Sequence, residues 1–116
     1  MVWPILNDVA TGDTPAYPDL QPQRFNQPQQ RILDAAVQVM GSLKGWRVSE
    51  RSESEVHAIR TTRLFRFKDD ITLRVLPDGD DWFRVHVRSK SRVGKGDFGQ
   101  NARNIRELQA ALSQRL

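Results

Sequence analysis

The fold is decided by residues 70–89, which read DITLRVLPDGDDWFRVHVRS. Apolar side chains occupy every second position on both sides of a turn: Ile71, Leu73 and Val75 before it, and Phe83, Val85 and Val87 after it. A period of two is typical of a β-strand that buries one face. The turn is PDGD at residues 77–80, and Asp-Gly is a strong hairpin signal. We therefore predict antiparallel strands over residues 70–76 and 82–89.

Further elements are predicted on both sides of this hairpin. Upstream, residues 45–50 and 55–62 are expected to be strands, and residues 28–44 carry an apolar stripe at helical spacing. Downstream, residues 98–115 form a second amphipathic helix, with Asp97 as its expected N-cap. The order α-β-β-β-β-α predicts an α+β fold. It is a two-layer sandwich in which both helices cover one face of a four-stranded antiparallel sheet.

The first 27 residues are rich in proline, with Pro4, Pro15, Pro18 and Pro22. Proline fixes φ and removes a backbone donor, so we expect an extended arm rather than regular structure. The arm also holds apolar and aromatic residues, so we expect it to lie across the single domain formed by residues 28–116. Its first residues have neither the charged n-region nor the apolar core of a signal peptide.

The composition limits the possible classes of protein. The chain has 116 residues, 38% of them hydrophobic, and a mean hydropathy of −0.61, which fits one water-soluble domain. It has no cysteine, which excludes disulfides, thiolate metal sites and a cysteine nucleophile. His57 and His86 do not have metal-binding spacing, and there is no serine-hydrolase elbow. We therefore expect no catalytic residue, no metal and no cofactor.

The most distinctive feature is the basic, glycine-rich run over residues 88–106, which has six bases and one acid in a chain of net charge +4. It contains GKGDFG at residues 94–99, a literal match to the G-x-G-x-x-G motif of dinucleotide-binding folds. We exclude a dinucleotide fold, because the preceding strand is antiparallel and no later strand follows to carry the ribose-binding acid. A basic run at a helix start still favours anions.

Two interpretations of this run stay open. In the first, it accepts an anion through a patch made of Arg88, Arg92, Lys95 and Arg103. In the second, Asp69, Asp70 and Asp97 pair with these arginines and fix the corner between the last strand and the last helix.

Two other basic groups precede or overlap this run. Residues 61–70, TTRLFRFKDD, interleave bases with Phe65 and Phe67, which suits single-stranded nucleic acid. We favour a strand whose aromatic side chains face the core. Arg74, Arg84, His86 and Arg88 are expected to share the outward face of the sheet, as a basic stripe that anions reach or that the acidic N-terminal arm covers.

Three segments together resemble the domain of unknown function 1499 family: RLFRFKDD at 63–70, VRSKSRVG at 87–94 and DFGQNARNI at 97–105. The resemblance spans roughly residues 14–115. It implies a small α+β domain, often in secreted, lipoprotein or membrane-anchored bacterial chains, and no established activity. The positions that match its motifs are Phe65, Arg66, Asp69, Asp70, Arg88, Ser89, Ser91, Arg92, Gly94, Asp97, Gly99, Asn101 and Arg103.

The leading hypothesis is a non-enzymatic binding or accessory domain of the bacterial envelope or periplasm, although the composition also suits a cytoplasm. Its partner is then an anionic ligand or a membrane surface rather than nucleic acid. Many members of the family carry an N-terminal segment with a cysteine; this chain has none, so we expect no lipid anchor through it. The alternatives are a small enzyme that uses Asp69 or Asp70 as a base on an anionic molecule, or a purely structural module.

Overall fold

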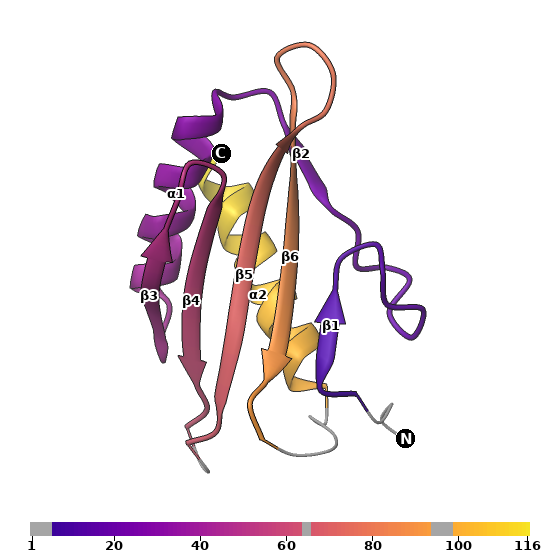
Figure 1. Ribbon diagram of the computed structural model, residues 1–116, viewed down its shortest axis with the longest axis vertical. Helices are drawn as coiled ribbons and strands as arrows, with labels where there is room; N and C mark the ends of the chain where they lie inside the picture. Colours follow the sequence, from indigo (N-terminus) through magenta and orange to yellow (C-terminus); the bar gives the residue numbers. More distant parts are fainter. Residues whose placement is uncertain (1–5, 64–65, 94–98) are drawn as a thin grey trace.

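The computed structural model describes residues 6–63, 66–93 and 99–116 (Figure 1). Within these ranges lie six strands and two helices. In chain order they are β1 (Asp8–Ala10), β2 (Gln23–Phe25), α1 (Gln29–Ser42), β3 (Trp46–Arg51), β4 (Glu55–Thr61), β5 (Lys68–Pro77), β6 (Phe83–Ser91) and α2 (Gln100–Arg115).

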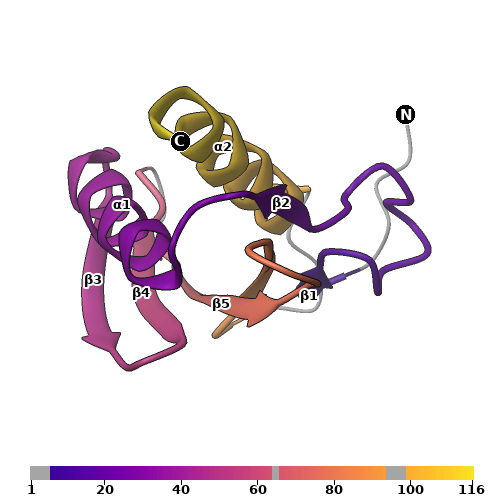
Figure 2. The same ribbon diagram turned by 90° about the horizontal axis from the view of Figure 1, so that it is seen from above.

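All six strands form one antiparallel sheet, in the order β1-β6-β5-β4-β3, with β2 also paired to β6. Both helices lie on the same side of this sheet (Figure 2). Helix α1 packs on β3, β4 and β5, whereas α2 packs on β6 and β1 and against α1. The core fills the space between the two layers, with fully buried side chains from both, among them Leu33, Met40, Ile71, Leu73, Ile105 and Leu108.

The predicted α+β architecture with two helices and an antiparallel sheet is confirmed, but the sheet has six strands rather than four. The two additional strands come from the proline-rich arm. Each has only three residues, and both pair with the outer edge of β6: Val9 lies opposite Ser89, and Arg24 lies opposite Arg84. Strands this short have no readable alternation, so their conformation depends on the partner strand rather than on their own sequence.

The arm is also anchored in the core. Thr11 is buried and forms two hydrogen bonds with one residue of β6: the Thr11 N–H donates to the Val87 carbonyl at 2.9 Å, and the Val87 N–H donates to Thr11 Oγ1 at 3.1 Å. Val9 and Leu20 are buried among the core side chains. The edge of β6 is therefore covered at both β1 and β2, with Thr11 bridging the ladder next to β1.

Two local predictions are wrong. Helix α2 begins at Gln100 with Gly99 in the N-cap position at φ 79°, so Asp97, which lies outside the described residues, is not the N-cap. A left-handed conformation is one that glycine adopts easily. The strand predicted through residue 62 ends at Thr61, and Phe67 is 49% exposed in a connection before β5 rather than turned to the core. Phe65 lies outside the described residues.

Among the residues that the structure describes, no helix is both long enough and apolar enough to cross a membrane.

Burial of Leu20 predicts that the arm contributes to stability. Replacing it by alanine (Leu20→Ala) removes a side chain that is 2% exposed and leaves a cavity in the core. We expect the free energy of unfolding, measured by urea titration, to fall by about 2–5 kcal/mol. The exposed arm residue Pro15 is the control, and Pro15→Ala is expected to change the value by less than about 1 kcal/mol. Equal, small effects of both changes would show that the arm is not part of the core.

Candidate functional site

Several residues that match the sequence motifs meet in a buried polar cluster between the sheet and α2. We define this corner cluster as Asp69 of β5, Ser89 and Ser91 of β6, and Asn101 and Asn104 of α2. All five are buried, and Ser89, Asn101 and Asn104 are fully so. They reach one place because alternate positions of the two strands face the helices, and Asn101 and Asn104 lie one turn apart on the helix face that meets them.

Hydrogen bonds link the whole corner cluster. The Asn104 amide donates to Asp69 Oδ2 at 2.8 Å and to Ser89 Oγ at 3.0 Å. The Ser89 hydroxyl donates to Asn101 Oδ1 at 2.6 Å, and the Asn101 amide donates to Ser91 Oγ at 2.8 Å. Buried polar groups are costly unless they are paired, and here they pair with one another across two layers. The cluster therefore fixes α2 against β5 and β6.

This arrangement lacks the parts of a nucleophilic site. The Ser89 hydroxyl donates to an amide oxygen, which is not a base that could remove its proton. Asp69 accepts from the Asn104 amide inside the protein, and neither Asp69 nor Asp70 lines the groove described below. Among the described residues there is also no group of three or more His, Asp or Glu side chains that could hold a metal.

Two arginines of the predicted anion patch form bidentate ion pairs on the sheet face that the helices leave uncovered. Arg92 donates from Nε and Nη2 to the two oxygens of Asp70, at 2.9 and 2.8 Å. Arg88 pairs in the same way with Asp8 of β1. These charged hydrogen bonds lower the pKa of both carboxyl groups and raise the pKa of both arginines. Of the pairings predicted from sequence, Asp70 with Arg92 is present.

Of the other predicted patch and motif residues that the structure describes, none lines the same pocket as Arg88. Arg103 is exposed on α2, where it donates to Gln100 Oε1 at 3.0 Å. Arg66 lies in the connection between β4 and β5, and Gly99 lies at the start of α2. Lys95, Gly94 and Asp97 lie outside the described residues. Among the patch candidates that the structure describes, Arg88 alone lines the groove described next.

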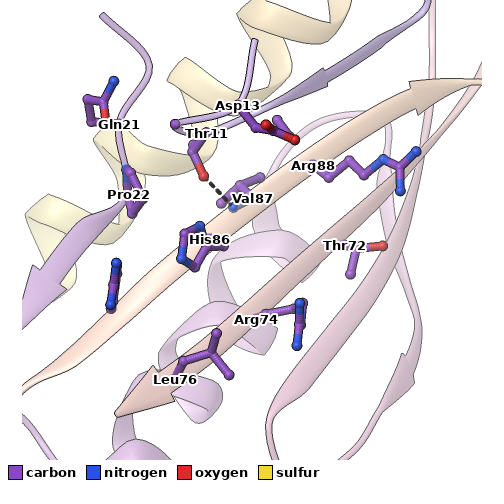
Figure 3. Close-up of a pocket in the computed structure, with 13 residues that line it drawn as sticks. Thr11, Asp13, Gln21, Pro22, Thr72, Arg74, Leu76, His86, Val87 and Arg88 are labelled. Carbon is purple, nitrogen blue, oxygen red and sulfur yellow. Dashed lines mark hydrogen bonds between the residues drawn. The ribbon is translucent and has the colours of Figure 1, made fainter. Parts of the chain in front are cut away.

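A groove of about 540 Å³ lies on the uncovered face of the sheet, between β5, β6 and the N-terminal arm (Figure 3). We call it the sheet groove. Arg74, Arg84, His86 and Arg88 contribute its basic and imidazole side chains, and Thr72 and Leu76 lie between them. The arm provides the other wall through residues 10–13 and 21–22. The arm therefore does not cover the basic stripe predicted from alternation but forms one wall of the groove that contains it.

Each arginine of the sheet groove has an acidic partner at its rim. Arg74 Nε is 3.4 Å from Glu55 Oε2, and Arg84 Nη2 is 3.6 Å from Asp78 Oδ1. All three arginine side chains remain about half exposed, at 53% for Arg74, 44% for Arg84 and 55% for Arg88. Exposed pairs of this kind contribute only about 0–1 kcal/mol, so a ligand can compete for these guanidinium groups.

His86 lies in the middle of this basic groove. Burial, together with the positive charges of Arg84 and Arg74, lowers the pKa of its imidazole below the ordinary value of 6.5. At neutral pH the ring is therefore uncharged. An anion bound beside it would reverse this effect, because a negative charge favours the imidazolium form.

Two contributions to the site could not be foreseen from the motifs. Asn104 is central to the corner cluster, yet in sequence it is one polar residue among many on an amphipathic helix. Only its place on the same turn as Asn101 and Ile105 signals that it faces inward. The arm wall of the sheet groove depends on the pairing of β1 and β2 with β6, for which the sequence has no local signal.

Loss of the Asn104 amide should destabilise the fold. In Asn104→Ala, the buried Asp69 and Ser89 each lose a hydrogen-bond donor, at about 1–3 kcal/mol for each group left unpaired. We expect the free energy of unfolding to fall by at least about 2 kcal/mol. Gln114→Ala, at an exposed position of the same helix, is the control. A loss no larger than that of the control would contradict a stabilising role of the cluster.

Comparison with known proteins confirms the family resemblance. No curated protein matches the sequence. The family model described as protein of unknown function (DUF1499) matches residues 5–112, nearly the whole chain. The matched range includes the corner cluster, the sheet groove and the strands of the arm. The chain therefore belongs to the DUF1499 family, whose function is unknown.

Proposed function

We propose that this protein is a non-enzymatic binding or accessory module that accepts an anionic group in the sheet groove. The observation that carries the proposal is the convergence of Arg74, Arg84, Arg88 and His86 from two adjacent strands on one groove of about 540 Å³. A volume of this size suits a small molecule or a head group. Guanidinium groups bind phosphate and carboxylate through paired, charged hydrogen bonds.

The wider sheet surface supports the same choice of ligand. Seven bases occupy strand positions on the uncovered face, and only four acids do, namely Asp8, Glu50, Glu55 and Asp70. The seven bases are Arg24, Arg47, Lys68, Arg74, Arg84, Arg88 and Lys90. An uneven surface of this kind attracts anions before they reach the groove. Together with the family resemblance, this charged surface supports a role at the bacterial envelope, where anionic head groups are abundant.

The enzyme alternative has less support, and the structural alternative explains residues outside the sheet groove. An enzyme that uses Asp69 or Asp70 needs one of these carboxylates beside a ligand, but Asp69 is buried in the corner cluster and Asp70 pairs with Arg92. A purely structural role fits the corner cluster well. We therefore assign Ser89, Ser91 and Asn101 a structural part and the sheet groove the binding part.

A charge reversal within the groove tests the proposal. At low salt, we expect inorganic phosphate and phosphatidylglycerol vesicles to bind, and phosphatidylcholine vesicles not to bind. Arg74→Glu is expected to weaken both interactions about tenfold, or about 1.4 kcal/mol. Arg31→Glu makes the same change of net charge at an exposed site on α1, away from the groove, and is the control. Isothermal titration and vesicle sedimentation provide the readouts.

Two outcomes would contradict the proposal. Equal weakening by Arg31→Glu would mean that net charge, rather than the groove, attracts the anion. Absence of any binding at low salt, where exposed charges are least screened, would reject the proposal outright.

The lowered pKa of His86 predicts how binding depends on pH. Anion binding favours the protonated ring, so affinity should rise as the pH falls through 6.5 and below. The probe is sulfate, whose charge is constant over this range, titrated at about pH 7.5 and about pH 5.5. His86→Asn is expected to remove this component of the increase, whereas His57→Asn, outside the groove lining, keeps it. An identical pH profile for wild type and His86→Asn would contradict the assignment.

The lowered pKa of His86 has the opposite effect on the stability of the ligand-free protein. Because the folded state holds the His86 proton less tightly than the unfolded chain does, this residue contributes stability at neutral pH. That contribution decreases as the pH falls below 6.5, and it is lost below the lowered folded pKa. Acid thus weakens the free protein at His86 while it strengthens the complex with an anion, and a ligand-dependent gain in melting temperature should grow on acidification.

A further inference from the structure

A second basic pocket lies on the helix side of the sheet, where α1 and β4 end. Both elements end toward the bottom of Figure 1. The volume of the pocket is about 520 Å³. Four bases and one acid line it: Lys44 after α1, Arg60 of β4, Arg63 and Arg66 of the β4–β5 connection, and Glu107 of α2. Among the residues that the structure describes, the rest of the lining is Gly45, Thr61 and Thr62.

The bases of this pocket differ from those of the sheet groove in their pairing. Arg74, Arg84 and Arg88 each have an acidic partner at the rim of the groove. By contrast, Lys44, Arg63 and Arg66 form no ion pair with any residue in the described part of the chain. Glu107 is the one acid in the lining, and it pairs with Arg60 at 3.3 Å. The formal excess is three positive charges within one pocket, and these charges repel one another until an anion binds.

Arg60 is the most enclosed of the four bases, with a side chain that is 20% exposed. Its Nη1 donates to Asn104 Oδ1 at 2.7 Å and to Glu107 Oε2 at 3.3 Å, so the corner cluster holds the guanidinium in place. Its Nε is buried without a hydrogen-bond acceptor. Nη2 forms no hydrogen bond to the described residues, so its donors are available to a ligand in the pocket. Arg60 is therefore a preorganised cation with unused donor capacity.

The backbone holds the other bases at the mouth of the pocket. The β4–β5 connection is closed at its base, because the Thr62 N–H donates to the Phe67 carbonyl at 2.7 Å and the Phe67 N–H donates to Thr62 Oγ1 at 2.8 Å. Arg63 and Arg66 stand just inside these two bonds. Arg66 has φ 55°, a left-handed conformation that is unfavourable for a residue with a side chain. Strain of this kind is concentrated at ligand-binding positions.

The opposite wall is set by a close approach of two backbone segments. Gly45 has φ 88°, and its carbonyl accepts the Thr61 N–H at 2.8 Å. A β-carbon at Gly45 would lie 2.9 Å from the Thr61 carbonyl oxygen, which is too close for any other residue without a shift of the backbone. This contact keeps Lys44 next to the end of β4, and so within reach of the same ligand as Arg60.

We propose that this pocket binds a compact molecule or head group that carries a diphosphate or two neighbouring phosphates. An excess of three positive charges calls for a ligand with more than one negative charge. Arginine side chains and threonine hydroxyls match phosphate oxygens. Because charged and polar side chains dominate the described lining, we expect the phosphates themselves to carry the affinity. This site is separate from the sheet groove and does not depend on the function proposed there.

The test uses pyrophosphate as the probe and titration calorimetry on the full chain. Arg63→Glu and Arg66→Gly are each expected to weaken pyrophosphate binding at least tenfold. Arg66→Gly also replaces a strained residue by one that adopts positive φ freely, so its melting temperature should not fall. Loss of binding in this variant is then not caused by unfolding. Glu107→Gln removes the competing carboxylate and is expected to strengthen binding.

Two controls separate this site from the sheet groove and from net charge. Arg74→Glu and Arg31→Glu change the charge as Arg63→Glu does, and both are expected to leave pyrophosphate affinity within about twofold. If Arg74→Glu weakens binding and Arg66→Gly does not, pyrophosphate occupies the groove. The second site is then rejected while the function proposed for the groove stands. Equal weakening by Arg31→Glu also rejects the second site.

A competition experiment identifies the source of the phosphates. Phosphatidylcholine vesicles with and without diacylglycerol pyrophosphate, whose head group carries two linked phosphates, are added to the pyrophosphate complex. Displacement only by the vesicles that contain this lipid, together with weaker sedimentation of Arg66→Gly than of wild type on the same vesicles, supports a lipid head group as the ligand. Full retention of pyrophosphate supports a soluble compound in the same pocket.

Discussion

The pleat of β6 sends successive side chains to opposite faces of the sheet, and β6 is hydrogen-bonded along both edges. On one face Val85 and Val87 enter the core, and Ser89 and Ser91 enter the corner cluster. On the other face Arg84, His86 and Arg88 remain accessible and line the sheet groove. A shift of one residue in the register of β6 would exchange these two sets and bury the arginines. The core, the corner and the groove thus depend on one strand register.

The hairpin of β5 and β6 could be predicted because its alternation is regular over many residues and its turn has a strong signal. The two helices could be predicted for the same reason, from apolar stripes. The strands of the arm could not, because three residues between prolines have no period to read. Phe67 was misjudged because a run of alternating bases and aromatics looks like a strand. Instead, Phe67 lies between β4 and β5, where its carbonyl accepts the Thr62 N–H and its own N–H donates to Thr62 Oγ1.

The candidate sites, like the fold, could be predicted only in part from the sequence. The motif residues Ser89, Ser91, Asn101 and Asp69 could be singled out from sequence, and they lie together. Their structural role could not be inferred from sequence, because it depends on Asn104, whose side chain links them. The basic stripe of the groove followed from alternation, whereas its arm wall did not. The second pocket unites residues from the turn after α1, from β4, from the β4–β5 connection and from α2. Only tertiary packing brings segments so far apart in sequence to one place.

The covering of β6 by the arm also bears on how copies of this chain meet one another. An uncovered strand edge is a template for pairing with another molecule, and β1 and β2 occupy the outer edge of β6. The opposite edge is β3, where a bulge between Val48 and Glu50 interrupts the ladder and charged side chains such as Arg47 project. Bulges and charges of this kind hinder intermolecular sheet extension. The proline-rich arm therefore covers a strand edge that would otherwise be open to pairing with another molecule, in addition to forming one wall of the sheet groove.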